Sequence, residues 1–133
     1  MTVAVGDEMT PLDRTVTQDQ VNAYADASGD HNPIHLDVDF ARSVGLPGTI
    51  AHGLLEMGIL TEAVARWAGG FDSVVSVSCR FSKPLLPGAT ITCSGRVTDV
   101  DDATGIAGLE LSALSSSGDR VLTNGRATVR LPL

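Results

Sequence analysis

The second half of the chain alternates apolar and polar positions with a period of two, the pattern of half-buried β-strands. In the first such stretch the apolar side chains share one face: Val75, Val77, Cys79 and Phe81. The alternation returns in three later stretches, residues 91–97, 109–113 and 121–131. Turn-forming residues separate them at positions 84–88, 101–105 and 115–119. The pattern predicts four strands joined by short connections as an antiparallel meander.

The first half carries helix signals instead. Thr17 and Gln20 have the spacing of a capping box, and Gly29 is a natural stop. These residues predict a helix that begins at Thr17 and ends before Gly29. A shorter helical turn is predicted over residues 37–44, with Asp37 as its cap.

The longest predicted helix runs over residues 52–68 and stops at Gly69-Gly70. It is apolar nearly all round, as expected of a helix in the middle of a fold. The apolar face of the predicted sheet must be covered, and this helix is the element able to cover it. We therefore expect an α+β fold, a sheet curled around a central helix, in a single domain over residues 1–133.

Composition narrows the possible partners. The formal net charge of −7 argues against a nucleic-acid-binding face, because a phosphate backbone requires basic residues. Three charged residues interrupt the apolar run of residues 50–68: Glu56, Glu62 and Arg66. No membrane span is therefore expected. Cys79 and Cys93 have no metal-ligand spacing and are expected to be buried free thiols. With no signal-peptide pattern at the start, we expect a cytoplasmic protein.

The chemically informative segment is the run from Gly29 to His35, between two predicted helices. Asp30 and His35 are separated by a bend at Pro33, which can bring a carboxylate and an imidazole to one point. Such a pair can hold and deprotonate a water molecule. Asn32 can orient a neighbour by hydrogen bonding while it stays uncharged. The alternative is structural: Asp30 caps the next turn and His35 is a satisfied histidine.

A second group lies at the start of the long helix, where Gly53 follows His52. A helix N-terminus presents free N–H groups and a partial positive charge, and glycine permits close approach to the backbone. This is a suitable place for an oxyanion hole. The alternative is that Gly53 only permits tight packing.

Together these segments resemble the hydratase motif of the MaoC-like family. The resemblance is carried by Tyr24, residues 28–35, Ala41 and residues 51–53, with further likeness in Arg80-Phe81, Pro84, Pro87-Gly88 and residues 125–127. Members are (R)-specific enoyl-CoA hydratases and 3-hydroxyacyl thioester dehydratases with the hot-dog fold, a long helix wrapped by an antiparallel sheet. The length is similar to that of catalytic subunits of mycobacterial-type 3-hydroxyacyl carrier-protein dehydratases.

The resemblance implies roles for these residues. Asp30 and His35 would activate the water that adds to C3 of a trans-2-enoyl thioester, or run the reverse elimination. The Gly53 N–H would polarise the thioester carbonyl, and Asn32 would support the site. The substrate would be a thioester of coenzyme A or of acyl carrier protein, and no metal or organic cofactor is expected.

Other residues are assigned less directly. His52 either lines the pocket or caps the helix, and Thr61 would place a small hydroxyl near Asp30, by analogy with the family. His31 is expected to be exposed. Four basic residues are considered for phosphate contacts, each with a plain surface charge as the alternative: Arg80, Lys83, Arg96 and Arg126. The acids and histidines of residues 30–39 resemble a metal cluster by count, but the proline bend and the metal-free motif favour none.

Two other functions remain open. A hot-dog thioesterase would hydrolyse the thioester itself and tends to carry its acid on the central helix, where Glu56 and Glu62 lie. A partner subunit of a heterodimeric dehydratase is expected to lack the Asp30–His35 pair. For assembly, residues 74–81 are apolar enough to form an edge strand that pairs across a two-fold axis. We therefore expect a homodimer, or a heterodimer with a related hot-dog subunit.

Overall fold

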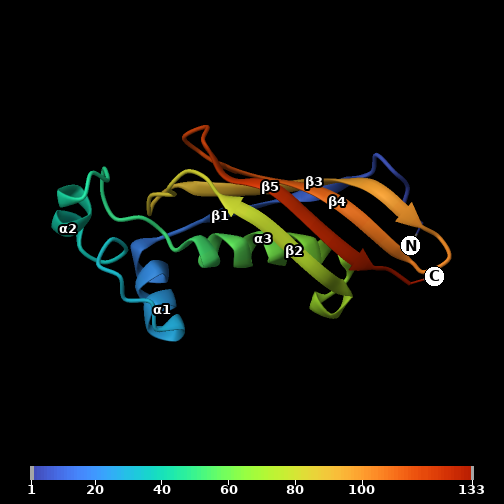
Figure 1. Ribbon diagram of the computed structural model, residues 1–133, viewed down its shortest axis with the longest axis horizontal. Coiled ribbons are helices and arrows are strands. Elements are labelled where there is room, and N and C mark those ends of the chain that lie inside the picture. Colours follow the sequence, from blue (N-terminus) through green and yellow to red (C-terminus); the bar gives the residue numbers. More distant parts are fainter. Residues whose placement is uncertain (1, 133) are drawn as a thin grey trace.

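The computed structural model describes residues 2–132. Its helices and strands follow one another as β1 (Glu8–Thr15), α1 (Gln18–Ser28), α2 (Val38–Ser43), α3 (Gly53–Ala68), a 3-10 turn η1 (Phe71–Ser73), β2 (Val74–Phe81), β3 (Thr90–Asp101), β4 (Ile106–Ser115) and β5 (Arg120–Arg130). The strands form one five-stranded antiparallel sheet, and α3 lies along its face (Figure 1). This confirms the α+β, hot-dog architecture expected from the sequence.

The helix ends follow the local signals. The Thr17 hydroxyl accepts a hydrogen bond from the Gln20 N–H at 3.1 Å, and Gly29 ends α1 in the left-handed conformation with φ of 79°. The Asp37 side chain caps α2 by accepting from the Phe40 N–H. These contacts lie within a few residues of each other, which is why the sequence alone locates them.

The strand order is β1-β3-β4-β5-β2, which corrects the predicted meander. Strands β3, β4 and β5 are successive neighbours, but β2 pairs with β5 at one edge instead of with β3. Period-two alternation shows which residues share a face, and it does not show which strands are neighbours. The other edge is β1, which was not individually predicted; Pro11 lies in it, where the register with β3 is shifted.

Two predicted inward positions on β2 point outward. Val75 is 54% exposed and Phe81 is 55% exposed, whereas Val77 and Cys79 pack against the core. The pairing of β2 with β5 shifts register twice, between Val74 and Ser76 and again between Ser78 and Arg80. Each shift changes which face the following side chains occupy.

The long helix packs against β1, β2, β3 and β5. Its core-facing stripe includes Ile59, Leu60, Ala63 and Val64. The prediction of burial all round is wrong at Leu54, which is 62% exposed. Helices α1 and α2 gather at the end where α3 begins, away from the described chain ends (Figure 1). Within residues 2–132, no helix is long and apolar enough to cross a membrane.

Candidate active site

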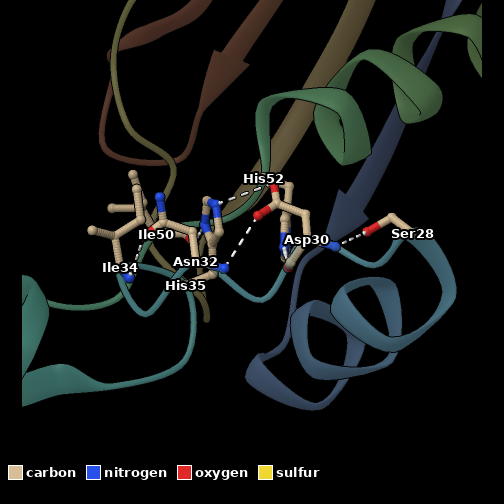
Figure 2. Close-up of polar contacts among 7 residues, drawn as sticks. All are labelled: Ser28, Asp30, Asn32, Ile34, His35, Ile50 and His52. Carbon is tan, nitrogen blue, oxygen red and sulfur yellow. Dashed lines mark hydrogen bonds and ion pairs between the residues drawn. The ribbon is translucent and has the colours of Figure 1, made fainter.

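Hydrogen bonds between side chains and the backbone two residues away shape the loop that follows α1. The Ser28 hydroxyl accepts from the Asp30 N–H, and Asp30 Oδ1 accepts from the Asn32 N–H at 3.2 Å. Asn32 Oδ1 in turn accepts from the Ile34 N–H at 3.2 Å. Asp and Asn favour such turns because their side chains reach the backbone two residues ahead. The Asn32 side chain therefore shapes the loop, and its backbone N–H orients the Asp30 carboxylate (Figure 2).

The loop brings Asp30 and His35 together, with 3.9 Å between Asp30 Oδ2 and His35 Nε2. This separation exceeds a direct hydrogen bond, and one water oxygen can bond to both atoms. His35 is buried, whereas the Asp30 side chain is about half exposed. His35 Nδ1 lies 2.7 Å from the Ile50 carbonyl oxygen. Because a carbonyl only accepts, Nδ1 carries hydrogen, so Nε2 is the ring atom that a water molecule between His35 and Asp30 would meet.

His52 supports this pair and does not cap α3 through its side chain. Its ring stacks on the His35 ring with centroids 3.8 Å apart, and Tyr24 packs on it at 4.8 Å. His52 Nε2 donates to the Asp30 backbone carbonyl at 3.0 Å (Figure 2). The ring thus fixes both the backbone of Asp30 and the plane of His35.

Gly53 opens α3, so its N–H belongs to the helix end that lacks intrahelical acceptors. A Cβ built on Gly53 would lie 2.7 Å from Cδ2 of the Phe81 ring. Glycine therefore lets the Phe81 ring pack closely against the start of α3, and it also suits an oxyanion site. The position of Phe81 beside Gly53 could not be predicted from the sequence, because β2 and α3 meet only through the tertiary fold.

A pocket of about 310 Å³ lies beside His35 and Gly53, and neither Asp30 nor His52 is among the residues that border it. It is bordered by His35, Leu46, Ile50, Ala51, Gly53, Glu56, Phe81, Ser82, Lys83 and Pro84. Of the four basic residues considered for phosphate contacts, only Lys83 lines it. Arg96 pairs with Glu110 on β4, Arg126 lines a separate depression of about 220 Å³, and Arg80 is not among the residues that border the pocket.

Thr61 and His31, for which the sequence also gave expectations, make hydrogen bonds outside the Asp30–His35 pair. The Thr61 hydroxyl donates to the Met57 carbonyl within α3 at 2.8 Å, eight residues beyond the start of the helix. At a rise of about 1.5 Å per residue this is about 12 Å along the axis from Gly53, so the structure does not gather Thr61 with the pair. His31 is exposed as expected and pairs with Asp26 at 3.0 Å, and this contact raises the pKa of its imidazole.

The structure also gathers ligand atoms of Asp30, His35 and His52 within 4.8 Å of one another. His52 Nε2 donates to the Asp30 carbonyl, whereas His52 Nδ1 is buried with no hydrogen-bond partner among the described residues. The sequence prediction that the site works without a metal stays a prediction.

The residue that sequence reasoning placed least well is Glu56. It was considered only as a thioesterase acid, yet it is 4% exposed, and its Oε1 is shielded from solvent with no hydrogen-bond partner among the described residues. Burial raises the pKa of this carboxyl to about 8. The signal was present: Glu56, Leu60 and Ala63 follow helical spacing, so the carboxyl shares the apolar stripe of α3.

Known proteins match both the sequence and the fold. The family profile described as MaoC like domain matches residues 2–114. The (R)-specific enoyl-CoA hydratase of Aeromonas caviae is 31% identical over 114 residues, covering 85% of this chain and 84% of that protein. The 3-hydroxyacyl-thioester dehydratase Y of Mycobacterium tuberculosis is 39% identical over 84 residues, which is 61% of this chain but only 29% of that protein. The chain thus spans less than a third of the latter relative.

Solved structures agree over almost the whole chain. The structure described as the (R)-hydratase from A. caviae involved in PHA biosynthesis has a TM-score of 0.89 and 28% identity, with 98% of each chain covered. The ChsH1–ChsH2 complex from M. tuberculosis has a TM-score of 0.85 and 26% identity, covering 99% of this chain and 100% of the matched chain. Because the profile covers most of the chain and the fold agrees, this chain belongs to the MaoC-like domain family.

Proposed function

We propose that this chain catalyses the reversible hydration of trans-2-enoyl thioesters to (3R)-3-hydroxyacyl thioesters of coenzyme A or acyl carrier protein. The observation that carries the proposal is the pair itself: Asp30 Oδ2 lies 3.9 Å from His35 Nε2, and His35 borders a mostly apolar pocket. The proposal is supported by the names of two relatives, a hydratase and a dehydratase, because hydration and dehydration are the two directions of this reaction.

In this mechanism one water oxygen is held by Asp30 Oδ2 and His35 Nε2. His35 takes a proton from the water as its oxygen adds to C3 of the enoyl thioester. The displaced electron pair moves toward the thioester oxygen, where the Gly53 N–H at the start of α3 stabilises the developing negative charge. A proton returned from the pair to C2 completes the addition of one water across the double bond. Elimination follows the same steps in reverse.

Binding would extend from the pair in two directions. The acyl group would occupy the pocket beside Phe81, and Lys83 at the same pocket would meet a phosphate of the pantetheine-bearing carrier. Asn32 would act by holding the loop rather than by contacting the substrate. We also propose that the protein works in a reducing compartment such as the cytoplasm, since Cys79 and Cys93 are both free.

For the assembly we propose a homodimer or a heterodimer with a related hot-dog subunit. Strand β2 is an edge strand, and it exposes Val75 and Phe81. Leu54, at the start of the neighbouring helix, is exposed as well. An apolar edge of this kind favours pairing with a second sheet. The description of the ChsH1–ChsH2 structure as a complex supports the heterodimeric form.

The test is hydration of crotonyl-CoA and trans-2-hexenoyl-CoA, followed by the loss of enoyl thioester absorbance, with free thiol titrated in the same sample. Asp30→Asn keeps the Oδ1 acceptor that orders the loop but removes the charge, and His35→Ala removes the base. Each should lower kcat by about two to four orders of magnitude. Because both act on one water, the double variant should be little worse than the poorer single variant.

The chain contains a matched control in its other Asp–His pair. Asp26 and His31 lie 3.0 Å apart and are exposed near the same loop. Asp26→Asn and His31→Ala should leave kcat within about twofold of the wild type. Near-normal hydration by folded Asp30→Asn protein contradicts the assignment. Thiol release without hydration identifies a thioesterase instead.

A further inference from the structure

Glu56 is a buried acid that the proposed hydration does not use. Its Oε1 is shielded from solvent and has no hydrogen-bond partner among residues 2–132, although the side chain borders the same pocket as His35 and Gly53. Leaving a buried polar atom unpaired costs free energy, because the atom loses its hydrogen bonds to water and gains none in the protein. Such atoms in native proteins call for an explanation, and a pocket wall offers one: the partner arrives with the ligand.

The position of Glu56 on α3 fixes which part of a ligand it would meet. It lies three residues after Gly53, so both residues share one face and are separated by about 4.5 Å along the helix axis. Helical side chains lean back toward the N-terminus, which brings the carboxyl toward the Gly53 end. If the thioester oxygen lies at Gly53 and C3 lies at the Asp30–His35 pair, the next part of the acyl chain is the part nearest Glu56.

The surroundings of Glu56 favour a neutral partner. Cys79 and Cys93 are the titratable groups on the sheet whose pKa values Glu56 affects, and neither is cationic. His35 and Lys83 border the same pocket, but neither is hydrogen bonded to Glu56 Oε1. Burial without a basic partner favours the protonated carboxyl. A protonated carboxyl both donates and accepts, so its natural complement is a neutral oxygen that does the same.

We propose that Glu56 is a specificity-determining residue that selects enoyl thioesters whose acyl chain carries a neutral hydroxyl just beyond C3, over the plain alkyl chains of the same length. The inference rests on the proposed hydration function and adds a substrate class to it. A hydroxyl at C4 or C5 would satisfy the unpaired carboxyl, whereas a methyl group in its place would leave that carboxyl buried without a partner. Sites built around a substrate hydrogen bond discriminate in this way.

The experiment compares isosteric pairs of coenzyme A thioesters: 4-hydroxy-trans-2-butenoyl with trans-2-pentenoyl, and 5-hydroxy-trans-2-pentenoyl with trans-2-hexenoyl. In each pair a hydroxyl replaces a methyl group of similar size. We expect the wild-type kcat/KM to favour the hydroxylated member of at least one pair by about tenfold to a hundredfold, the range of an unpaired buried polar group. Crotonyl-CoA serves as the substrate without either group.

Three variants sharpen the result. Glu56→Gln keeps a neutral donor and acceptor and should keep the preference, whereas Glu56→Met, which is apolar and of similar length, should abolish or reverse it. Glu62→Gln is the control, because Glu62 lies on the same helix but bonds Arg14 at 2.7 Å and is outside the pocket. It should leave the preference unchanged.

The possible failures are distinguishable. If wild-type protein hydrates crotonyl-CoA but shows no preference in either pair, the specificity inference is overturned and the hydration function stands. If the preference survives in Glu56→Met, it arises elsewhere and the inference is overturned again. If no enoyl thioester is hydrated at all, the proposed function fails and this inference fails with it. The wild-type comparison needs no variant, so poor folding of Glu56→Met leaves the proposal testable.

Discussion

Replacing Glu56 by Gln should stabilise the fold increasingly as the pH rises. Burial raises the pKa of this carboxyl from 4.5 to about 8. Between these values the unfolded chain has released the proton while the folded chain still binds it. The unfolded state therefore binds fewer protons, and the free energy of unfolding falls as the pH rises. The contribution of the protonated acid is fully present below about pH 4.5 and is lost as the pH rises through about 8.

The magnitude follows from the two pKa values. Each pH unit between 4.5 and about 8 removes about 1.4 kcal/mol from the free energy of unfolding, which amounts to about 5 kcal/mol over the whole window. The pKa values of the Cys79 and Cys93 thiols are influenced by Glu56. These thiols do not titrate in this window, because burial raises both thiol pKa values above their usual range, that of Cys93 to about 12. Wild type and Glu56→Gln share all their other titratable groups, including His35 and Lys83 at the same pocket. The contributions of these groups cancel in the difference in free energy of unfolding between the two proteins, unless a group is coupled to Glu56.

The assay is urea unfolding followed by circular dichroism from pH 5 to pH 9 at constant ionic strength. The Glu56→Gln advantage over wild type should be small near pH 5 and should grow to several kcal/mol by pH 8–9. Glu62→Gln is the control of opposite sign. The Arg14 hydrogen bond lowers the pKa of Glu62, so wild type should be the more stable protein near neutrality and lose that advantage in acid. A Glu56→Gln difference that does not change with pH would refute a buried neutral Glu56.

Three further predictions test the site and the assembly. Gly53→Ala should lower kcat/KM by about tenfold or more. If the added methyl group acts by displacing the Phe81 ring, the second substitution Phe81→Ala should restore the activity of Gly53→Ala. If activity is not restored, the loss is assigned to the Gly53 N–H site. Treatment with EDTA should leave hydration unchanged, and loss of activity that Zn²⁺ restores would show that Asp30, His35 and His52 hold a metal. Light scattering across a dilution series should show a dimer of twice 13.8 kDa or a larger even assembly at micromolar concentration, and an active monomer there contradicts pairing through β2.

The fold could be predicted wherever local chemistry decides it. The bounds of α1 and α3 follow from Thr17, Gly29 and Gly69, because a cap or a left-handed stop acts within one helical turn. The position of β2 in the sheet could not be predicted. Its partner β5 lies more than forty residues later, and alternation carries no information about neighbours. The same two register shifts that turn Val75 and Phe81 outward are invisible in the period-two pattern.

The candidate site divides in the same way. Asp30, Asn32 and His35 lie in one loop, which is shaped by hydrogen bonds from Ser28 to Ile34, so a short motif identifies them. The stacked His52 ring and the Phe81 ring reach the site from elsewhere in the chain. Their contributions depend on how α3 packs against the loop and the sheet, which no local pattern specifies.

The Asp30–His35 pair and Glu56 should affect kcat/KM in different ways. Asp30 and His35 each have one atom held by backbone, Oδ1 by the Asn32 N–H and Nδ1 by the Ile50 carbonyl, which leaves Oδ2 and Nε2 directed at each other. They would meet the double bond, which every enoyl thioester has. Glu56 would meet only the part of the acyl chain that varies. Variants of the pair should therefore lower kcat/KM for all substrates by a similar factor, while Glu56→Met should change the ratio between hydroxylated and alkyl substrates. A uniform loss in Glu56→Met, with the ratio intact, would place Glu56 in the fold rather than in substrate choice.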